Sequence, residues 1–283
     1  MKLLGLLGFP LKHSFSPNLM NTLAGKAKLP FAYFPFEIKK NDLAKFMDAV
    51  RLLPVYGFNV TIPYKEAVLP FLDELSPEAG GIGAVNTVLN ETGRLKGFNT
   101  DSTGFLTSVT KLFGTASFPE SALVLGSGGA ARAVVYGLLA AGVHQIFVVN
   151  RHPERAETLV NRFSRIFPRA KLSPGPLDLN HLRKILMETD FIIQTTSVGT
   201  WPDTAAAVPF PFETLRAGQK VLDLVYNPPE TEFLKRARRS GAEGISGFSM
   251  LIGQAAKALE IWGFAGQEEG LWKIAREMHE KNN

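Results

Sequence analysis

The sequence predicts an α/β protein, and three observations carry that prediction. First, 283 residues are enough for two domains, each with its own core. Second, strand-like apolar runs alternate with helical patterns from the N-terminus, as in layered α/β domains. Third, residues 122–155 read as a strand, a glycine-rich turn, a helix and a second strand, which is the content of one βαβ unit.

The composition is typical of a soluble globular protein, with 45% hydrophobic and 20% charged residues. The absence of cysteine excludes disulfides and thiolate metal sites and favours a cytoplasmic location. No apolar run approaches membrane-spanning length, and residues 1–10 are too short for a signal peptide. The five histidines, at positions 13, 144, 152, 181 and 279, show no metal-ligand spacing. We therefore expect no bound metal and no membrane partner.

The net charge of +5 is compatible with two kinds of partner. Nucleic acid is one, but no basic run is interleaved with aromatic residues, and the densest cluster, residues 235–239, reads as the exposed face of a helix. A small anionic molecule explains the sign of the charge equally well. We expect a small anionic substrate and no nucleic acid.

The N-terminal third alternates strands and helices. The patterns predict strands at 3–8, 31–38 and 56–60 and helices at 16–27 and 42–52. Ser16 before Pro17 is typical of a helix start, so capping is one role for Ser16. Ser14 has no such role, and two hydroxyls two residues apart, just past a strand end, can donate together to one carboxylate. Capping and ligand binding both stay open.

Thr61 and Lys65 follow the third predicted strand. In an open α/β sheet, ligands bind outside the carboxyl ends of the strands, which is where both residues lie. We predict Lys65 in the first turn of a helix, where a cation opposes the helix dipole and needs another reason to be there. A solvated surface lysine is the alternative, and it is the commoner fate of a single lysine.

Residues 77–83 read as a glycine-rich loop, and a hairpin with strands at 84–89 and 94–98 follows it. Asn86 lies on the first strand of this hairpin. Asp101 follows the second strand and opens a helix that runs to Phe113. Asp101 is therefore either an N-cap or, if Lys65 is functional, part of the same site.

The glycine-rich turn of the central βαβ unit matches the dinucleotide-binding fingerprint, with alanine in the last place. Gly126 provides the tight turn, Gly128 lets a pyrophosphate approach the backbone, and Ala131 packs the helix on the strand. A phosphate would lie at the N-terminus of the helix, which covers residues 131–141. A turn without a ligand is the alternative, but the flanking strands and helix favour nucleotide binding.

The second strand of this unit, residues 146–149, indicates which nucleotide binds. A NAD site usually ends this strand with Asp or Glu, which accepts a hydrogen bond from the ribose 2′-OH. Here the strand is followed by Asn150 and Arg151, with Arg155 four residues later. Guanidinium groups pair with phosphate, and cations at a helix N-terminus oppose its dipole. We therefore predict that Arg151 and Arg155 bind the 2′-phosphate of NADP.

The remainder of the chain continues the alternation. We expect helices at 153–167, 180–188 and 247–262, a proline-rich loop around Pro174 and Pro176, and strands at 191–195 and 221–225. Residues 196–203 are a loop at a strand end that faces the cofactor. Most of the last helix packs against a domain, and Gln254 is the exception that we expect to face the cleft.

The chain resembles the shikimate dehydrogenase family from end to end. The motifs that carry the resemblance are, in chain order, residues 14–17, 59–63 with Lys65, 83–87, 97–101 with Gly104 and Phe105, the Gly126 turn, 150–151, 223–226 with Pro228, and 247–255. So many short motifs in one order are jointly specific.

The resemblance implies a substrate-binding domain at residues 1–101 and 240–283, and a Rossmann-type NADP-binding domain at residues 102–239. It implies NADPH-dependent, reversible reduction of 3-dehydroshikimate to shikimate, a step of aromatic amino acid biosynthesis. Lys65, paired with Asp101, would be the acid/base residue. The implied substrate-binding residues are Ser14, Ser16, Thr61, Asn86, Tyr226 and Gln254. The implied cofactor-binding residues are Gly126, Ser127, Gly128, Gly129, Ala130, Asn150, Arg151, Arg155, Thr196 and Gly247.

Four positions depart from the family pattern. Met20 and Tyr64 stand where such sequences often have His, His152 where they often have Thr, and Gln194 where they have Asn. Two alternatives stay open: a quinate/shikimate dehydrogenase with broader substrate and cofactor use, and a ligand sensor without activity on the same fold. The sequence also leaves open whether the chain is a monomer or a homodimer.

Overall fold

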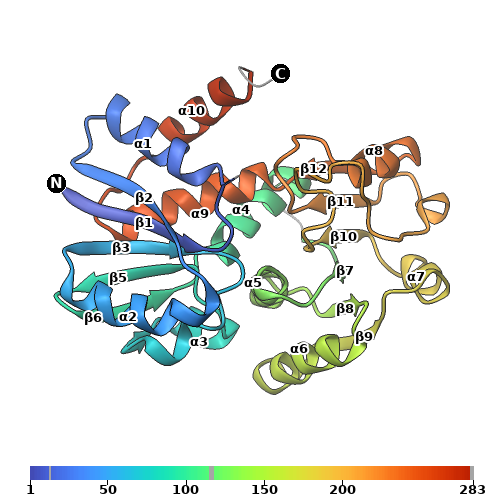
Figure 1. Ribbon diagram of the computed structural model, residues 1–283. Coiled ribbons are helices and arrows are strands. Elements are labelled where there is room, and N and C mark those ends of the chain that lie inside the picture. The colour runs from blue at the N-terminus through green and yellow to red at the C-terminus, as the bar shows by residue number, and fades with distance from the viewer. Residues whose placement is uncertain (13, 115–117, 281–283) are drawn as a thin grey trace. The chain divides into compact units, whose positions relative to one another are not determined.

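The chain folds into two compact units, residues 1–100 with 252–283 and residues 101–251 (Figure 1). The structure is a computed structural model that describes residues 1–12, 14–114 and 118–280. His13, which directly precedes Ser14, lies outside the described residues. In the described part of the chain, no helix has the length and apolar character needed to cross a bilayer.

The first unit contains a mixed six-stranded sheet in the order β2-β1-β3-β5-β6-β4. β1 is parallel to both of its neighbours, and β5 and β6 form the antiparallel hairpin that the sequence predicts. Because β1 and β3 run in parallel side by side, their carboxyl ends lie at one edge of the sheet. The strands are β1 (Lys2–Gly8), β2 (Phe31–Glu37), β3 (Val55–Val60), β4 (Glu74–Leu75), β5 (Thr87–Glu91) and β6 (Arg94–Phe98).

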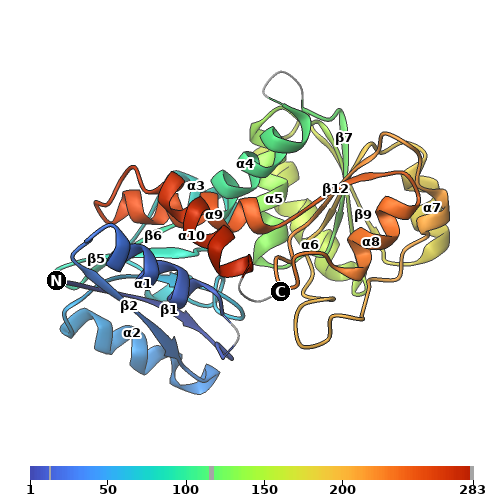
Figure 2. The same ribbon diagram turned by 90° about the horizontal axis from the view of Figure 1, so that it is seen from above.

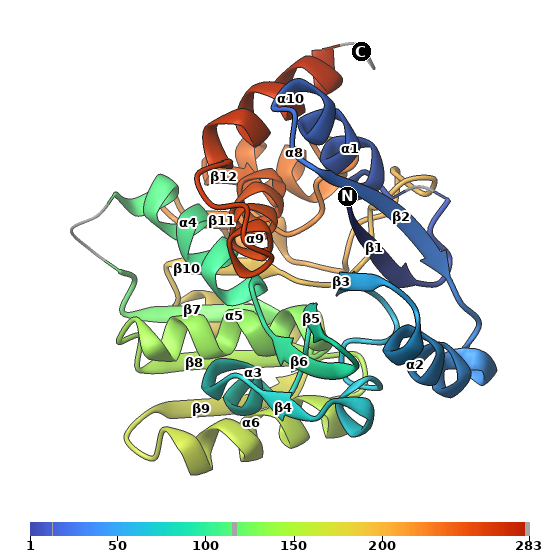
Figure 3. The ribbon, with the colours of Figure 1, turned by 90° about the vertical axis from the view of Figure 1, so that its left-hand side faces the viewer.

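Helices cover both faces of this sheet. On one face, α2 (Leu43–Leu52) and α3 (Pro77–Ile82) bury apolar side chains against β3, β5 and β6. On the other, α1 (Ser16–Lys26) and α10 (Glu268–Glu280) lie side by side, as Figure 3 shows. Trp262, which follows α9 (Phe248–Ile261), is fully buried and donates from Nε1 to the Val88 carbonyl at 3.0 Å. Gly57 makes room for this indole, since a Cβ there would lie 2.3 Å from Nε1.

The second unit contains a parallel six-stranded sheet in the order β12-β11-β10-β7-β8-β9. This is the doubly wound order, in which the chain first builds outward from β7 through β8 to β9 and then returns to β10 on the other side. The switch point lies between β7 and β10, and ligands of such sheets bind at the carboxyl ends of the strands there. The strands are β7 (Ser121–Leu125), β8 (Gln145–Asn150), β9 (Lys171–Pro176), β10 (Phe191–Gln194), β11 (Lys220–Asp223) and β12 (Glu243–Ser246).

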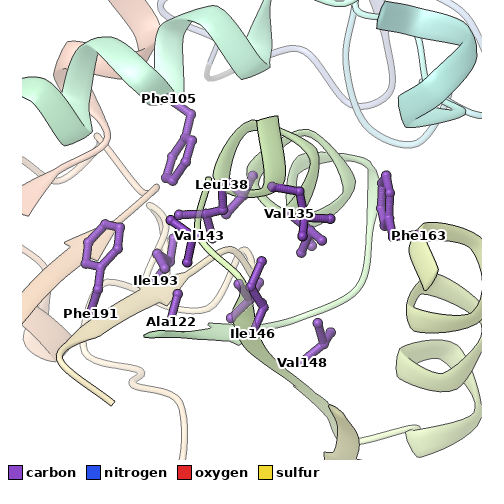
Figure 4. Packing of buried hydrophobic residues seen from close by; sticks show 14 of the residues in the cluster. Phe105, Ala122, Val135, Leu138, Val143, Ile146, Val148, Phe163, Phe191 and Ile193 are labelled. Carbon is purple, nitrogen blue, oxygen red and sulfur yellow. The ribbon is translucent and has the colours of Figure 1, made fainter. Parts of the chain in front are cut away.

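Both faces of this sheet are buried, as its continuous apolar strands indicate. Side chains alternate: Ala122 and Val124 of β7 enter the core cluster drawn in Figure 4, whereas Leu123 and Leu125 enter the cluster on the opposite face. Figure 2 shows α5 and α6 on one side of the strands and α7 and α8 on the other. The helices are α4 (Asp101–Phe113), α5 (Gly129–Ala140), α6 (Pro153–Ile166), α7 (Leu179–Leu186) and α8 (Glu232–Arg239).

The α/β prediction is confirmed, but three segments have a different type of secondary structure from the one predicted. Lys65 is not in a helix: residues 61–68 form turns that lead into a 3₁₀ helix at Leu69–Phe71. Residues 77–83 are not a loop, because Ser76 caps α3 and Pro77 begins it, and these signals outweigh the helix-weakening glycines. The proline-rich stretch at 171–176 is the strand β9; it lies at the sheet edge, where a missing N–H costs no ladder hydrogen bond.

Candidate active site

The glycine-rich turn lies at the carboxyl end of β7, at the switch point of the second unit. Gly126 adopts φ +112°, a conformation that favours glycine, and its N–H donates to the Val149 carbonyl at 2.8 Å. A Cβ on Gly126 would lie 2.5 Å from Thr195 Oγ1. Thr195, just past β10, donates from its N–H and its hydroxyl to the Leu125 carbonyl, at 3.0 and 2.7 Å. The loops after β7 and β10 therefore meet at Gly126.

Gly128 differs from Gly126, because the fold itself does not require glycine there. Its φ of −80° suits any residue, and apart from its own backbone neighbours no described atom lies within 4 Å of where a Cβ would be. Gly128 is also the N-cap of α5, and no described side chain caps that end. The first N–H groups of α5 and the positive end of its dipole lie at this turn, which suits a phosphate. Ser127, Gly129 and Ala130 complete this turn, and the buried Ala131 packs α5 on the sheet.

Asn150 ends β8 next to this turn. Its Nδ2 donates to Ser127 Oγ, and its Oδ1 accepts from the His152 N–H at 3.2 Å. Arg151 and Arg155 flank the start of α6, and both are exposed. Within the described residues neither arginine pairs with a carboxylate, whereas the nearby His152 Nδ1 lies 3.7 Å from an acidic oxygen of Glu154. Two such cations at a helix N-terminus are well placed for an anionic ligand.

A buried polar pair that the sequence analysis did not assign lies behind Thr196. Gln194 is the last residue of β10, Asp223 is the last residue of β11, and the two stand opposite each other in register. Both are fully buried. The Gln194 amide donates to Asp223 Oδ1 at 3.3 Å and to the Val198 carbonyl at 3.2 Å, while its Oε1 accepts from the Thr196 N–H. The feature of the sequence that could have indicated this buried pair is Asp223, a carboxylate inside the apolar run 221–225.

Burial raises the pKa of Asp223 from 3.8 to about 6, and hydrogen bonds from Thr231 and the Val225 N–H only partly oppose this. Between these two values the folded protein binds a proton that the unfolded chain has lost. The Asp223 contribution to the free energy of unfolding is therefore most favourable below pH 4 and falls as the pH rises through 6. A rise from 3.8 to about 6, at about 1.36 kcal/mol per pKa unit, makes the loss about 3 kcal/mol.

We predict that Asp223→Asn removes this dependence. Urea denaturation of both proteins at several pH values from 4 to 7.5 should show the variant gaining stability relative to the wild type as the pH rises, by up to about 3 kcal/mol. Parallel pH profiles for the two proteins would contradict the raised pKa of Asp223.

Tyr226 and Gly247 lie on neighbouring segments of the second unit. Tyr226 follows β11 and is half-buried. The Gly247 N–H donates to the Val225 carbonyl at 3.2 Å, and a Cβ on Gly247 would lie 2.1 Å from the Leu224 carbonyl oxygen. Glycine at 247 thus has a packing reason of its own, and its contact with a cofactor stays a prediction.

Ser14 and Ser16 follow β1 in the first unit, and both are half-buried. The Ser14 N–H donates to the Leu11 carbonyl at 2.9 Å, which closes a turn. Ser16 is the first residue of α1, whose N-cap is Phe15, and no side-chain hydrogen bond caps this end among the described residues. The capping role for Ser16 is therefore wrong, and ligand binding is the role to test.

Thr61 and Lys65 follow β3 at the same edge of the sheet. The Thr61 N–H donates to the Leu7 carbonyl at 2.8 Å, and a Cβ on Gly8 would lie 2.5 Å from Thr61 Cγ2. The Lys65 carbonyl accepts from the Val85 N–H at 2.8 Å, directly before Asn86. The first unit therefore brings Thr61, Lys65 and the segment before β5 together.

Asn86 was predicted to lie on the first hairpin strand, but it directly precedes that strand, β5. Asn86 is buried in a polar network. Its Oδ1 accepts from the Thr100 N–H at 2.7 Å, and its Nδ2 donates to Thr100 Oγ1 at 2.9 Å. The Asn86 carbonyl accepts from Val60 N–H at 2.8 Å and from Asn59 Nδ2 at 3.1 Å. These bonds fix the orientation of Asn86 and hold Thr100, the residue before Asp101.

Asp101 is the buried first residue of α4 and of the second unit, whereas Lys65 and the half-buried Gln254 of α9 belong to the first. The Lys65–Asp101 pair and the substrate contact of Gln254 stay predictions. No group of three or more His, Asp or Glu side chains in the described chain is arranged to hold a metal ion.

A doubly wound sheet with a glycine turn at its switch point, and with two arginines after the neighbouring strand β8, defines a dinucleotide-binding α/β protein. Residues 6–88 match the family model for the shikimate dehydrogenase substrate binding domain, and residues 109–208 match that for shikimate / quinate 5-dehydrogenase. The chain belongs to the shikimate dehydrogenase family, as its resemblance predicted.

Relatives and solved structures cover nearly the whole chain. Shikimate dehydrogenase (NADP(+)) of Moorella thermoacetica is 42% identical over 92% of this chain and 87% of its own length. Shikimate 5-dehydrogenase from Thermus thermophilus, solved in complex with NADP(H) and shikimate, is 37% identical with a TM-score of 0.83, covering 98% of this chain and 99% of that one. Quinate dehydrogenase from Corynebacterium glutamicum, in complex with NAD, is 30% identical with a TM-score of 0.86, covering 98% and 99%.

Proposed function

We propose that this chain is an NADP-dependent shikimate dehydrogenase, which reduces 3-dehydroshikimate to shikimate reversibly. The observation that carries the proposal is the pairing of an open glycine turn at the switch point with two arginines, and no acidic residue, at the end of β8. Relatives of about 40% identity that are named for this activity, over 90% of the chain, support it. A cytoplasmic location, a monomeric or homodimeric state and the absence of a nucleic-acid partner remain part of the proposal.

In this proposal the second unit is the cofactor domain. The turn from Gly126 to Ala130 holds the pyrophosphate at the N-terminus of α5, and Arg151 and Arg155 pair with the 2′-phosphate. Asn150 braces the turn through Ser127. Thr196 and Gly247 complete the site. NADPH supplies the hydride when it is bound, and the protein supplies binding, orientation and electrostatics.

The first unit supplies the substrate groups. Ser14 and Ser16 donate to the substrate carboxylate, and Thr61, Asn86 and Gln254 contact the ring and its hydroxyls. Two further residues, Tyr226 at the ring and Asp101, come from the second unit. Lys65, as an ammonium, gives a proton to the oxygen that becomes an alkoxide during reduction, or stabilises the charge there. Asp101 holds Lys65 and accepts from a substrate hydroxyl. In the oxidation of shikimate the same groups take the proton back.

A quinate/shikimate dehydrogenase is the second candidate, because the Corynebacterium quinate dehydrogenase has the same fold over 98% of this chain. One assay separates the two. Shikimate and quinate are each offered with NADP⁺ and with NAD⁺, and reduced nicotinamide is followed by its absorbance. The proposal predicts that shikimate with NADP⁺ has the highest kcat/KM. Comparable turnover of quinate would favour the second candidate, and binding of shikimate and NADPH without turnover would favour a sensor.

The carboxylate-binding role of the two serines has its own prediction. Ser14→Ala or Ser16→Ala should raise the KM for shikimate about tenfold, because each variant loses one hydrogen bond to a charged group. Ser76→Ala is the matched control, since the Ser76 hydroxyl accepts from the Ala79 N–H at 3.1 Å as the cap of α3. The control should lose about 1 kcal/mol of stability with an unchanged KM. Serine variants that behave like the control would assign Ser14 and Ser16 to the turn alone.

A further inference from the structure

The carboxamide of Gln194 closes the loop after β10 into a small ring. Its Oε1 accepts from the Thr196 N–H, and its Nε2 donates to the Val198 carbonyl at 3.2 Å, so one side chain spans the backbone of three residues. The Val198 N–H in turn donates to Thr196 Oγ1 at 3.3 Å. The shape of the loop at 196–198 is therefore set by a side chain that lies beneath it.

Asp223 holds Gln194 in place. The second hydrogen of Gln194 Nε2 goes to Asp223 Oδ1 at 3.3 Å, and the same carboxylate accepts from the Val225 N–H at 3.0 Å and from the Thr231 hydroxyl at 2.6 Å. Gln194, Asp223 and Thr231 are each fully buried, so water does not compete for these bonds. Because both N–H groups and the oxygen of the Gln194 amide are used, the amide has one orientation.

The ring also borders the phosphate turn. A Cβ on Gly126 would lie 3.1 Å from Thr196 Cγ2 and 3.6 Å from the Thr196 N, in addition to its clash with Thr195. A shift of the 195–198 backbone would therefore alter the wall of the turn that is proposed to hold the pyrophosphate.

We propose that Gln194, braced by Asp223, is a positioning residue for the cofactor site: it holds the 195–198 loop in the shape that admits NADP(H) beside the Gly126 turn. This inference rests on the proposed function, which assigns Thr196 and the turn to the cofactor. Gln194 itself touches neither cofactor nor substrate in this account. Its effect is carried by the Thr196 and Val198 backbone.

The test replaces Gln194 with Met, which keeps the length and bulk of the side chain but cannot form these hydrogen bonds. The control is Gln219→Met. Gln219 is equally buried in the same unit and also holds backbone, donating to the Leu186 and Thr189 carbonyls at 3.1 and 2.7 Å and accepting from the Arg216 N–H at 2.7 Å. It precedes β11, at the opposite end of that strand from Asp223. Both variants should lower the melting temperature to a similar extent.

Only the Gln194 variant should change cofactor binding. We expect the KM for NADP⁺, and the Kd for NADPH measured by calorimetry, to rise at least tenfold in Gln194→Met, with the KM for shikimate changed less than twofold. In Gln219→Met all three constants should stay within twofold of the wild type. Equal cofactor affinity in the two variants would overturn the inference and leave Gln194 a structural residue.

Gln194→Glu provides a second variant that keeps the length and polarity of the side chain if the Met variant does not fold. It has at most one hydrogen to donate, so it cannot hold both the Val198 carbonyl and Asp223, and the NADP⁺ KM should rise threefold or more. An unchanged KM in this folded variant also overturns the inference. The activity of the wild type distinguishes a failure of the proposed function from a failure of the positioning role of Gln194. A wild type that does not reduce NADP⁺ contradicts the proposed function, whereas an active wild type with unaffected Gln194 variants contradicts this inference alone.

Discussion

Lys65→Met is expected to lower kcat by about 10²–10⁴-fold, equivalent to roughly 3–5 kcal/mol of barrier, with a much smaller change in KM. The proposed reaction needs a cation that delivers a proton to the carbonyl oxygen as the hydride arrives, and Lys65 is the residue that we assign to this step. Methionine keeps most of the bulk of the lysine stem and removes only the ammonium, so the fold and cofactor affinity should survive. Steady-state rates in both directions, together with NADPH titration, measure these quantities.

Lys96→Met is the matched control for this variant. Lys96 also belongs to the first unit, where its Nζ pairs with Glu74 at 2.5 Å in a structural role. The Lys96→Met variant should leave kcat unchanged.

Asp101→Asn should also lower kcat. If Lys65 and Asp101 act as a unit, the barrier increase in the double variant Lys65→Met, Asp101→Asn should be much smaller than the sum of the two single increases. A Lys65→Met protein with near-normal kcat would contradict the assigned acid/base role.

Arg151→Ala is expected to weaken NADP⁺ binding by about 10- to 150-fold, because it removes a charged hydrogen bond of roughly 1.5–3 kcal/mol to the 2′-phosphate. Binding of NAD⁺, which lacks this phosphate, should be almost unchanged. Arg155→Ala should behave in the same way if both guanidinium groups contact the phosphate. Affinities for the two cofactors, measured by titration on each variant, give the selectivity directly.

Arg183→Ala is the control for charge alone. Arg183 lies on the same unit and is half-exposed, but it pairs with Glu213 at 2.8 Å. Its loss should leave both cofactor affinities unchanged. If Arg151→Ala weakens NADP⁺ and NAD⁺ equally, the arginine supports the shape of the site and does not recognise the phosphate.

The sequence predicted the fold well where one physical signal dominated. The strands of the second unit are continuous apolar runs, and the glycine turn with its helix has a single structural solution, so β7, α5 and β8 were predicted to within two residues. Prediction failed where a weaker local signal competed. Proline in 171–176 argues against a strand until the edge position of β9 is known. The helix expected at Lys65 is replaced by turns.

The candidate site was predictable only in part, for a similar reason. Motifs place Gly126, Arg151 and Thr61 directly after strands, and the structure places them there, whereas Asn86 was expected on a strand and precedes it. Hydrogen-bonding partners were not predictable, because they depend on register between strands that are distant in the sequence. Gln194 and Asp223 are separated by 29 residues and meet only because β10 and β11 pair in parallel.

The most direct test of the central claim follows the hydrogen itself. Shikimate carrying deuterium at the carbon that is oxidised is incubated with the purified protein and NADP⁺, and the nicotinamide product is analysed by mass spectrometry. The proposed reaction transfers that deuterium to the nicotinamide ring, so the product should be NADPH with one deuterium, and Lys65→Met should form the same product far more slowly. Reduced cofactor without deuterium, or no reduced cofactor from a protein that binds both ligands, would contradict the proposal.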